Sequence, residues 1–331
     1  MDSQGARLGI VSVAQIIKEI SSCYGIMKQV DAITRPIEQN ERKMLISELT
    51  KSKYSLKEIT DFIKNSANVV VLTSEFITIN CLEPGANTGC LPVPMITLEN
   101  IMRRVMCTLR LCKEEKSMIF WIVPCDAIKE FPSPGQLVTP ENVNSAFTYK
   151  SGDTVFVYRK EELPKVVLHE TLHHVCCIDS QLIWTQEQLE RMFTIFNINR
   201  QTILRPNEAI VETWAELLHM AFIATHYGLN FSMIYEKELQ WSLVQAKRIL
   251  AKQGKNGATW REYTHAFSYY VIKSLFLFSP DAFLEASDLG DMSNIVALAK
   301  RVFISEDYAR AIHNAALPRH KCFRMTLYGD L

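Results

Sequence analysis

The sequence predicts an α+β protein: a small mixed sheet and the helix of a candidate active site in the front half, packed on a mostly helical C-terminal half. Runs of β-branched residues are confined to the part before Lys160, and beyond it apolar residues recur almost wholly at helical spacing. The 331 residues contain no internal repeat and no low-complexity tract. We therefore expect three regions around a shared core, at residues 1–66, 67–180 and 181–331.

The first region is predicted to be helical. Between Ile10 and about Asn65 the apolar residues recur at intervals of three and four, with Lys, Glu and Gln between them. This spacing predicts two or three amphipathic helices. We interpret this region as an accessory cap.

The second region is predicted to hold the sheet. Asn68–Ile79 is rich in β-branched residues and predicts one strand, Thr97–Cys112 predicts a helix, and Met118–Val123 predicts a second strand. Ala146–Tyr149 and Thr154–Tyr158 flank a short polar segment with one glycine, which predicts a hairpin. The sheet therefore ends just before the candidate active-site helix.

The third region is predicted to be helical throughout. Pro in the first turn and Gly at the end frame the Pro206–Tyr227 helix. The other expected helices are Thr185–Phe196, Ser232–Gln253, Trp260–Phe278, Met292–Phe303 and about Glu306–Ala316.

Composition argues against several classes of partner. Lys plus Arg and Asp plus Glu are equal at 36 each, so no net field favours nucleic acid or an anionic membrane. The best apolar stretch, Tyr269–Phe278, is interrupted by Lys273 and Ser274 and is too short to span a bilayer. The nine cysteines are odd in number and scattered, and Met1–Ile10 has no signal-peptide pattern. We expect a soluble, cytoplasmic protein that binds neither nucleic acid nor membranes.

The strongest chemical signal is His169-Glu170-x-x-His173 within the helical run Leu163–His174. Residues four apart stand on one face of a helix, so both imidazoles can bind one metal ion and the carboxylate between them can reach its water. The motif predicts one Zn²⁺ per chain, with His169 and His173 as ligands and Glu170 as general base. The alternative is two surface or core histidines that happen to lie one turn apart.

An acidic third ligand is expected from Asn207–Glu216. A catalytic zinc site takes three protein ligands and leaves one position open. Glu208, Glu212 and Glu216 are spaced by four and share one helix face, which also carries His219. Carboxylates stacked this way repel one another, and a bound cation would relieve the repulsion. A solvated acidic stripe is the alternative interpretation.

Together the two motifs resemble the gluzincin metallopeptidases. The thermolysin branch of that family carries Asn-Glu-Ala-Ile-Ser-Asp on its second site helix, and this chain has Asn-Glu-Ala-Ile-Val-Glu at 207–212. The resemblance implies a zincin-like fold, Glu208 as third zinc ligand, and Glu212 holding His169 through its other ring nitrogen. The interval from His173 to Glu208 is longer than in the family, which leaves the choice between Glu208 and Glu212 open.

A second element of the resemblance lies upstream. Asn144-Ser145-Ala146-Phe147 is similar to the Asn-Ala-Phe edge strand with which the family holds peptides. An unpaired edge beside the metal can accept an extended peptide backbone and aim its scissile carbonyl at the ion. The resemblance implies a substrate strand at Ser145, Ala146 and Phe147. A buried hairpin with no ligand role is the alternative.

We therefore expect a zinc metallopeptidase that acts on a peptide or protein substrate. Zinc lowers the pKa of its water toward about 7, and Glu170 takes the proton and later passes it to the leaving amine. The transition-state stabiliser stays unknown. The candidates are Tyr263, His265, Tyr269, Tyr270 and His226.

Two other functions compete with peptide hydrolysis. One is a zincin-like scaffold that binds without cleaving, although such a scaffold has no need of Glu170. The other is zinc-dependent hydrolysis of a different bond. Tyr158–Glu162 before the motif helix and Glu212-x-Trp214-Ala215 after it also look like metallopeptidase-like proteins of large DNA viruses. That likeness implies an infected host cell as the setting.

Overall fold

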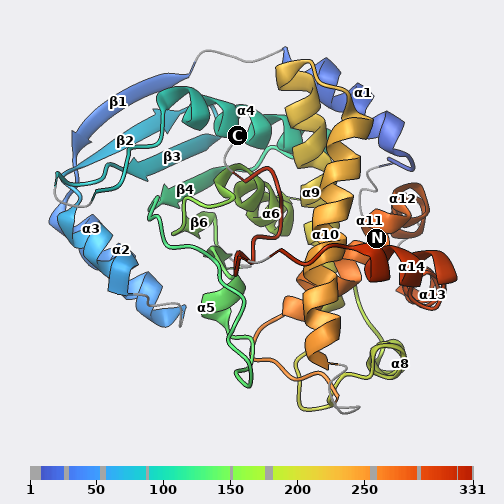
Figure 1. Ribbon diagram of the computed structural model, residues 1–331. Coiled ribbons are helices and arrows are strands. Elements are labelled where there is room, and N and C mark those ends of the chain that lie inside the picture. The colour runs from blue at the N-terminus through green and yellow to red at the C-terminus, as the bar shows by residue number, and fades with distance from the viewer. Residues whose placement is uncertain are drawn as a thin grey trace.

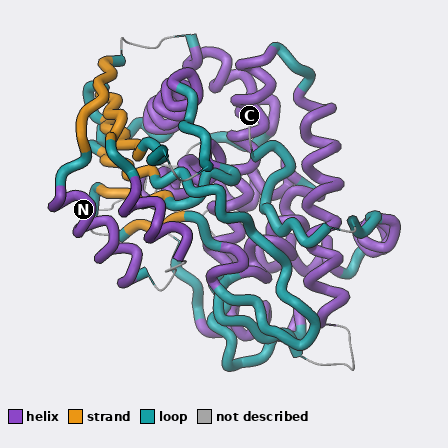
Figure 2. The backbone as a smooth tube through the Cα atoms, turned by 60° about the vertical axis from the view of Figure 1, so that its left-hand side comes forward, coloured by secondary structure: helices purple, strands orange, loops and turns teal. Residues whose placement is uncertain are grey.

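The computed structural model describes residues 9–25, 30–52, 57–86, 89–149, 152–175, 182–253, 259–288, 292–318 and 320–329. Strands gather on one side of the molecule and most helices on the other, as two views show (Figures 1 and 2). This arrangement confirms the α+β class that the sequence predicts.

Six strands form one mixed sheet. They are β1 (Asp31–Pro36), β2 (Asn68–Thr73), β3 (Ile77–Leu82), β4 (Met118–Ile122), β5 (Ala146–Thr148) and β6 (Thr154–Val157). Their order is β1-β2-β3-β4-β6-β5. β4 runs parallel to both β3 and β6, and the other pairs are antiparallel. The predicted hairpin is therefore confirmed, and β5 lies at an edge of the sheet.

Helices cover both faces of this sheet (Figure 1). They are α2 (Gln39–Lys51), α3 (Lys57–Asn65), α4 (Met95–Leu111) and α6 (Leu163–Val175). Leu45 and Phe62 of the first two pack with Trp121 on one face, and Met102 of α4 belongs with Phe120 to the main core on the other. Because neighbouring residues of a strand point to opposite faces, Phe120 and Trp121 pack on opposite sides of the sheet.

The remaining helices form the second half of the molecule. They are α1 (Val13–Tyr24), α5 (Pro140–Val143), α8 (Gln186–Phe196), α9 (Pro206–Tyr227), α10 (Phe231–Gln253), η2 (Phe267–Ile272), α11 (Lys273–Phe278), α12 (Pro280–Asp288), α13 (Met292–Phe303) and α14 (Glu306–Asn314). α9 is the central one, because every residue from Ala209 to Ala224 is buried. It ends as predicted at Gly228, whose φ of 62° is the left-handed value that glycine adopts without strain.

Two predictions in the front half are wrong in detail. Asn68–Ile79 is not one strand but most of a β2–β3 hairpin, turned at Ser74, whose N–H donates to Ile77 O at 2.9 Å. The first region holds its three helices but also β1, which pairs with β2. β1 shows no apolar alternation, since nearly all of its residues are exposed, so its sequence resembles a loop. The division into three regions stays a prediction.

The predicted Trp260–Phe278 helix begins later. Trp260 and Glu262 form isolated bridges to Ile198 and Val138, and the helix starts where the Glu262 carboxylate accepts the N–H of Ala266 at 2.6 Å. Its first part, η2, is a π-helix, which turns the following residues away from α-helical phase. The α12 helix was not predicted.

A C-terminal strap, residues 320–329, crosses the helical half and the entry to α6. Phe323 N donates to Lys129 O at 2.9 Å, and the Phe323 ring stacks on Tyr270 with centroids 4.1 Å apart. Lys273 Nζ donates to Met325 O at 2.6 Å. The strap therefore closes the core over buried charged groups.

Two observations bear on the expected setting. None of the described helices has the length and apolar character that crossing a membrane requires. Cys23, Cys81, Cys107, Cys125 and Cys322 are free thiols, whereas Cys112 is disulfide-bonded, which the sequence did not predict. The compartment stays a prediction.

Candidate metal centre

Two packed helices bring the predicted motifs together. α6 carries His169, Glu170 and His173, and α9 carries Glu208 in its first turn. The start of α9 is held by Asn207, whose side-chain oxygen accepts the indole N–H of Trp184. The segment just before α8 therefore fixes the end of the helix that presents Glu208.

The donor atoms of His169, His173 and Glu208 form a compact triangle. The two Nε2 atoms are 3.1 Å apart, and Glu208 Oε2 lies 3.5 Å from His169 Nε2 and 3.4 Å from His173 Nε2. Zinc ligands at about 2.0–2.1 Å in a tetrahedron are roughly 3.3–3.4 Å from one another. The triangle therefore has the size of one face of such a tetrahedron. These three buried or half-buried groups could hold a metal ion.

The charges around this triangle favour a cation. Burial alone would lower the pKa of His169, but the nearby carboxylates of Glu208 and Glu212 outweigh it and raise that pKa. Burial alone would raise the pKa of Glu208, yet the charges of His173 and His169 hold it well below its usual range. Burial raises the pKa of Glu170. The ionised carboxylate of Glu208 beside two imidazoles gives the triangle an anionic donor for a cation.

Glu212 lies behind the first histidine. Its Oε2 is 2.8 Å from His169 Nδ1, although the pair falls short of the angle of a well-formed hydrogen bond. Its Oε1 accepts from the buried ammonium of Lys165, one turn before His169 on α6. Burial would raise the pKa of Glu212, but Lys165 and His169 together outweigh burial and lower it. Glu212 is therefore ionised, lies beside His169 and is not a member of the triangle.

The far end of the same helix face serves packing. Glu216 is fully buried and lies 3.3 Å from Lys273 Nζ. His219 contacts Arg104 at 2.8 Å and Tyr328 O at 3.0 Å through its two ring nitrogens. The interpretation of this face as a solvated stripe is wrong, because lysines inside the protein balance its carboxylates.

The predicted substrate strand coincides with β5, a half-buried strand at the edge of the sheet. Tyr158 N donates to Ser145 O at 2.9 Å, and the next pair is Ala146 opposite Val157. Because hydrogen bonding alternates along an antiparallel strand, Ala146 N–H and C=O point away from β6. No described strand pairs with that side of β5. Phe147 turns to the other face, where its ring stacks on Phe156 at 5.0 Å.

Among the candidate stabilisers, Tyr269 lies closest to the triangle. Its hydroxyl donates to Glu208 Oε2 at 3.0 Å, and its ring meets that of His169 edge-on, with centroids 5.9 Å apart. The other candidates are differently engaged. Tyr270 donates to Phe323 O, His226 contacts Tyr24 Oη, His265 contacts Ile203 O, and Tyr263 is 69 % exposed.

A pocket of about 40 Å³ lies beside the triangle. Its lining includes Ser145, Ala146, His169, Glu170, Tyr269 and Met325. The strand edge, the proposed base and the aromatic hydroxyl therefore share one small space.

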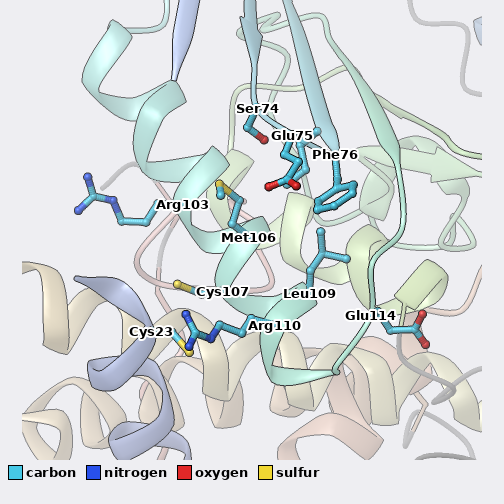
Figure 3. Close-up of a pocket in the computed structure, with 11 residues that line it drawn as sticks. Cys23, Ser74, Glu75, Phe76, Arg103, Met106, Cys107, Leu109, Arg110 and Glu114 are labelled. Carbon is cyan, nitrogen blue, oxygen red and sulfur yellow. The ribbon is translucent and has the colours of Figure 1, made fainter. Parts of the chain in front are cut away.

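A larger hollow of about 200 Å³ lies elsewhere, between α1, α4 and the β2–β3 turn (Figure 3). Its walls are mainly apolar, and Cys23 and Cys107 approach each other there beside Arg110. None of its lining residues belongs to the metal triangle.

Sequence reasoning missed Lys165 and Met325 and could not choose Tyr269. Lys165 had one usable signal, its position one turn before His169 on the same helix face. Met325 had none. Comparisons of the chain with protein-family models, with curated proteins and with solved structures gave no match.

Proposed function

We propose that this protein is a zinc-dependent metallopeptidase of the gluzincin type. The observation that carries the proposal is the size of the triangle between His169 Nε2, His173 Nε2 and Glu208 Oε2. Its support is the position of Glu170, which lines one pocket with His169 and the strand edge at Ala146.

The donor set suits zinc best. Two imidazoles and one carboxylate make up a known catalytic zinc set, and a tetrahedral ion would keep one position open. When bound, zinc would act as a Lewis acid and lower the pKa of water toward about 7. Glu212 would keep the His169 ring in the tautomer that leaves Nε2 free for the ion.

The protein's own groups would perform the remaining steps. Ala146 N–H and C=O would pair with an extended peptide and fix its scissile carbonyl near the triangle. Glu170 would take a proton from the attacking water and return it to the leaving amine. Burial raises its pKa toward the range where a carboxylate can do both. Tyr269 would donate its hydroxyl to the oxyanion.

The test compares the parent protein with Glu170→Gln. This substitution keeps the shape and the proposed ligands but removes the base. We expect about one zinc per chain in both proteins by elemental analysis, and cleavage of a mixed peptide library by the parent alone, read by mass spectrometry. A loss of roughly 10²–10⁴-fold in kcat is expected for general-base removal. Absence of zinc from the parent would contradict the proposal.

The role of Tyr269 has its own test. We expect Tyr269→Phe to lower kcat about 10²–10³-fold and to leave KM nearly unchanged, because the donor acts on charge that develops in the transition state. Tyr263→Phe is the matched control, since that ring is 69 % exposed. Equal kcat values for the two variants would remove Tyr269 from the mechanism.

A catalytically silent zincin-like scaffold is the competing function. Zinc in both the parent and Glu170→Gln, with cleavage by neither, would favour it or a non-peptide substrate. The buried carboxylate of Glu170 speaks for catalysis, because a scaffold gains nothing from burying it.

A further inference from the structure

The pocket beside the metal triangle is walled on one side by the C-terminal strap. Ser145 and Ala146 come from the strand edge, His169 and Glu170 from α6, and Met325 from the strap. A peptide that pairs with Ala146 and points its carbonyl at the triangle would direct the side chain beside the cleaved bond into this space.

The pocket is small. Its volume of about 40 Å³ is room for roughly three water-sized spheres, since one water needs about 10–15 Å³ on this measure. A serine or alanine side chain fits that space, whereas leucine or phenylalanine does not. A substrate with a larger residue there would have to displace a wall, and overpacking of a filled site is unfavourable.

Met325 is the lining residue that the C-terminal strap contributes. Its sulfur lies 3.6 Å from Lys165 Nζ, and its carbonyl accepts from Lys273 Nζ at 2.6 Å. The next residue, Thr326, is anchored by its N–H to Glu162 at 2.7 Å and by its hydroxyl to Glu238 at 2.9 Å. Because these anchors are buried, the strap does not yield easily at Met325.

We infer that this pocket is the subsite for a small residue, glycine, alanine or serine, directly beside the cleaved bond, and that Met325 of the strap determines this specificity. The inference rests on the proposed peptidase function and names the substrate class of the same site.

The experiment uses full-length, zinc-loaded protein and peptides that differ only at the residues flanking the cleaved bond. The parent is expected to cleave peptides with Gly, Ala or Ser on one side at least about 10-fold better, in kcat/KM, than those with Leu or Phe. Met325→Ala should raise kcat/KM for Val and Leu about 10-fold and so weaken that preference. Met233→Ala is the matched control, because Met233 is 61 % exposed on α10.

The outcomes distinguish failure of the subsite inference from failure of the proposed peptidase function. Cleavage by the parent without preference for small residues on either side overturns the inference and leaves the peptidase standing. Zinc binding without any cleavage overturns both. If Met325→Ala fails to fold, Met325→Val decides: this smaller truncation should also raise kcat/KM for Leu relative to Ala. An unchanged preference overturns the inference.

Discussion

Glu208 and Glu212 stand one turn apart on the same helix face, yet they have different neighbours. Around Glu208 the nearby positive groups are histidines, whose donor atoms lie 3.4 and 3.5 Å away. Glu212 receives the permanent charge of Lys165, and one turn further Glu216 lies 3.3 Å from Lys273. Among the described residues, lysines pair with Glu212 and Glu216, whereas the partners of Glu208 are histidines.

The difference shows how one acidic stripe can serve two purposes. A lysine ammonium neutralises a buried carboxylate and leaves no room for an ion, whereas neutral imidazoles add donor atoms without adding charge. Whether a glutamate of α9 could bind a metal or is neutralised by an ion pair therefore depends on the side chain opposite it on the neighbouring helix. Substitution of those partners should therefore change either the stability of the fold or its affinity for a metal ion.

The largest effect is expected from Lys165→Met. This change leaves the carboxylate of Glu212 buried without its ammonium, which should lower the free energy of unfolding by about 3–5 kcal/mol. Urea denaturation followed by circular dichroism measures it. Lys57→Met is the control, because Lys57 forms its 2.6 Å pair with Asp61 at 87 % exposure. That control should leave the midpoint almost unchanged.

Removal of one metal donor is expected to rank next. His173→Ala should weaken zinc binding by about 3–4 kcal/mol, or two to three orders of magnitude, roughly one ligand's share of a protein zinc site. Competition with a chelator measures the affinity. His174→Ala should bind zinc like the parent, because His174 contacts Thr148 instead of the triangle. Parental affinity in His173→Ala would exclude the triangle as the site.

A double variant separates the two duties of Glu212. Lys165→Met with Glu212→Gln removes both charges of the pair, so stability should return most of the way to the parental value. Zinc affinity should still fall about 10–100-fold, because His169 Nδ1 has lost its carboxylate. Chelator competition and urea denaturation on one preparation test both statements. If the double variant kept both the parental zinc affinity and the parental stability, Glu212 would have no role in orienting His169.

A pH-dependent effect concerns a carboxyl deeper in the network. Burial raises the pKa of Glu238 to about 8, with Glu216 adding to the shift. The folded protein therefore keeps a proton that the unfolded chain releases above about pH 4.5, and stability is lost as pH rises toward 8. The loss is at most about 1.4 kcal/mol per pH unit.

Glu238→Gln should flatten this dependence, since an amide cannot titrate. Its carbonyl can still accept from Thr326 and Leu327, which lie 2.9 Å from Glu238 Oε2. Thermal melts between pH 5 and 8 measure the difference. Glu236→Gln, on the exposed side of α10, should follow the parental curve. Parallel curves for Glu238→Gln and the parent would show that Glu238 carries no proton in the fold.

The sequence predicted best what depends on one helix. His169, Glu170 and His173 could be placed together because residues i and i+4 always share a face. The limits of α9 were equally local, since Pro206 and Gly228 mark its two ends. These features need no knowledge of the rest of the fold.

What depends on contact between distant segments could not be derived. Glu208 and Glu212 differ only in how α9 packs against α6, so sequence spacing could not distinguish the metal-facing residue from the orienting one. Tyr269 and Tyr270 are neighbours, and the π-helical turn of η2 decides which one faces the triangle. Lys273 pairs with Glu216 across 57 residues, and no local pattern reports such a pair.

The strap has a consequence for the order of assembly. Chains are made from the N-terminus and domains tend to fold as they emerge, yet Thr326 and Met325 supply partners to Glu162, Glu238 and Lys273, all of which are made earlier. Until the strap arrives, these buried groups remain hydrated and the pocket stays open on that side. Completion of the pocket beside the triangle therefore waits for the strap, whose Met325 is the last of the lining residues to be made.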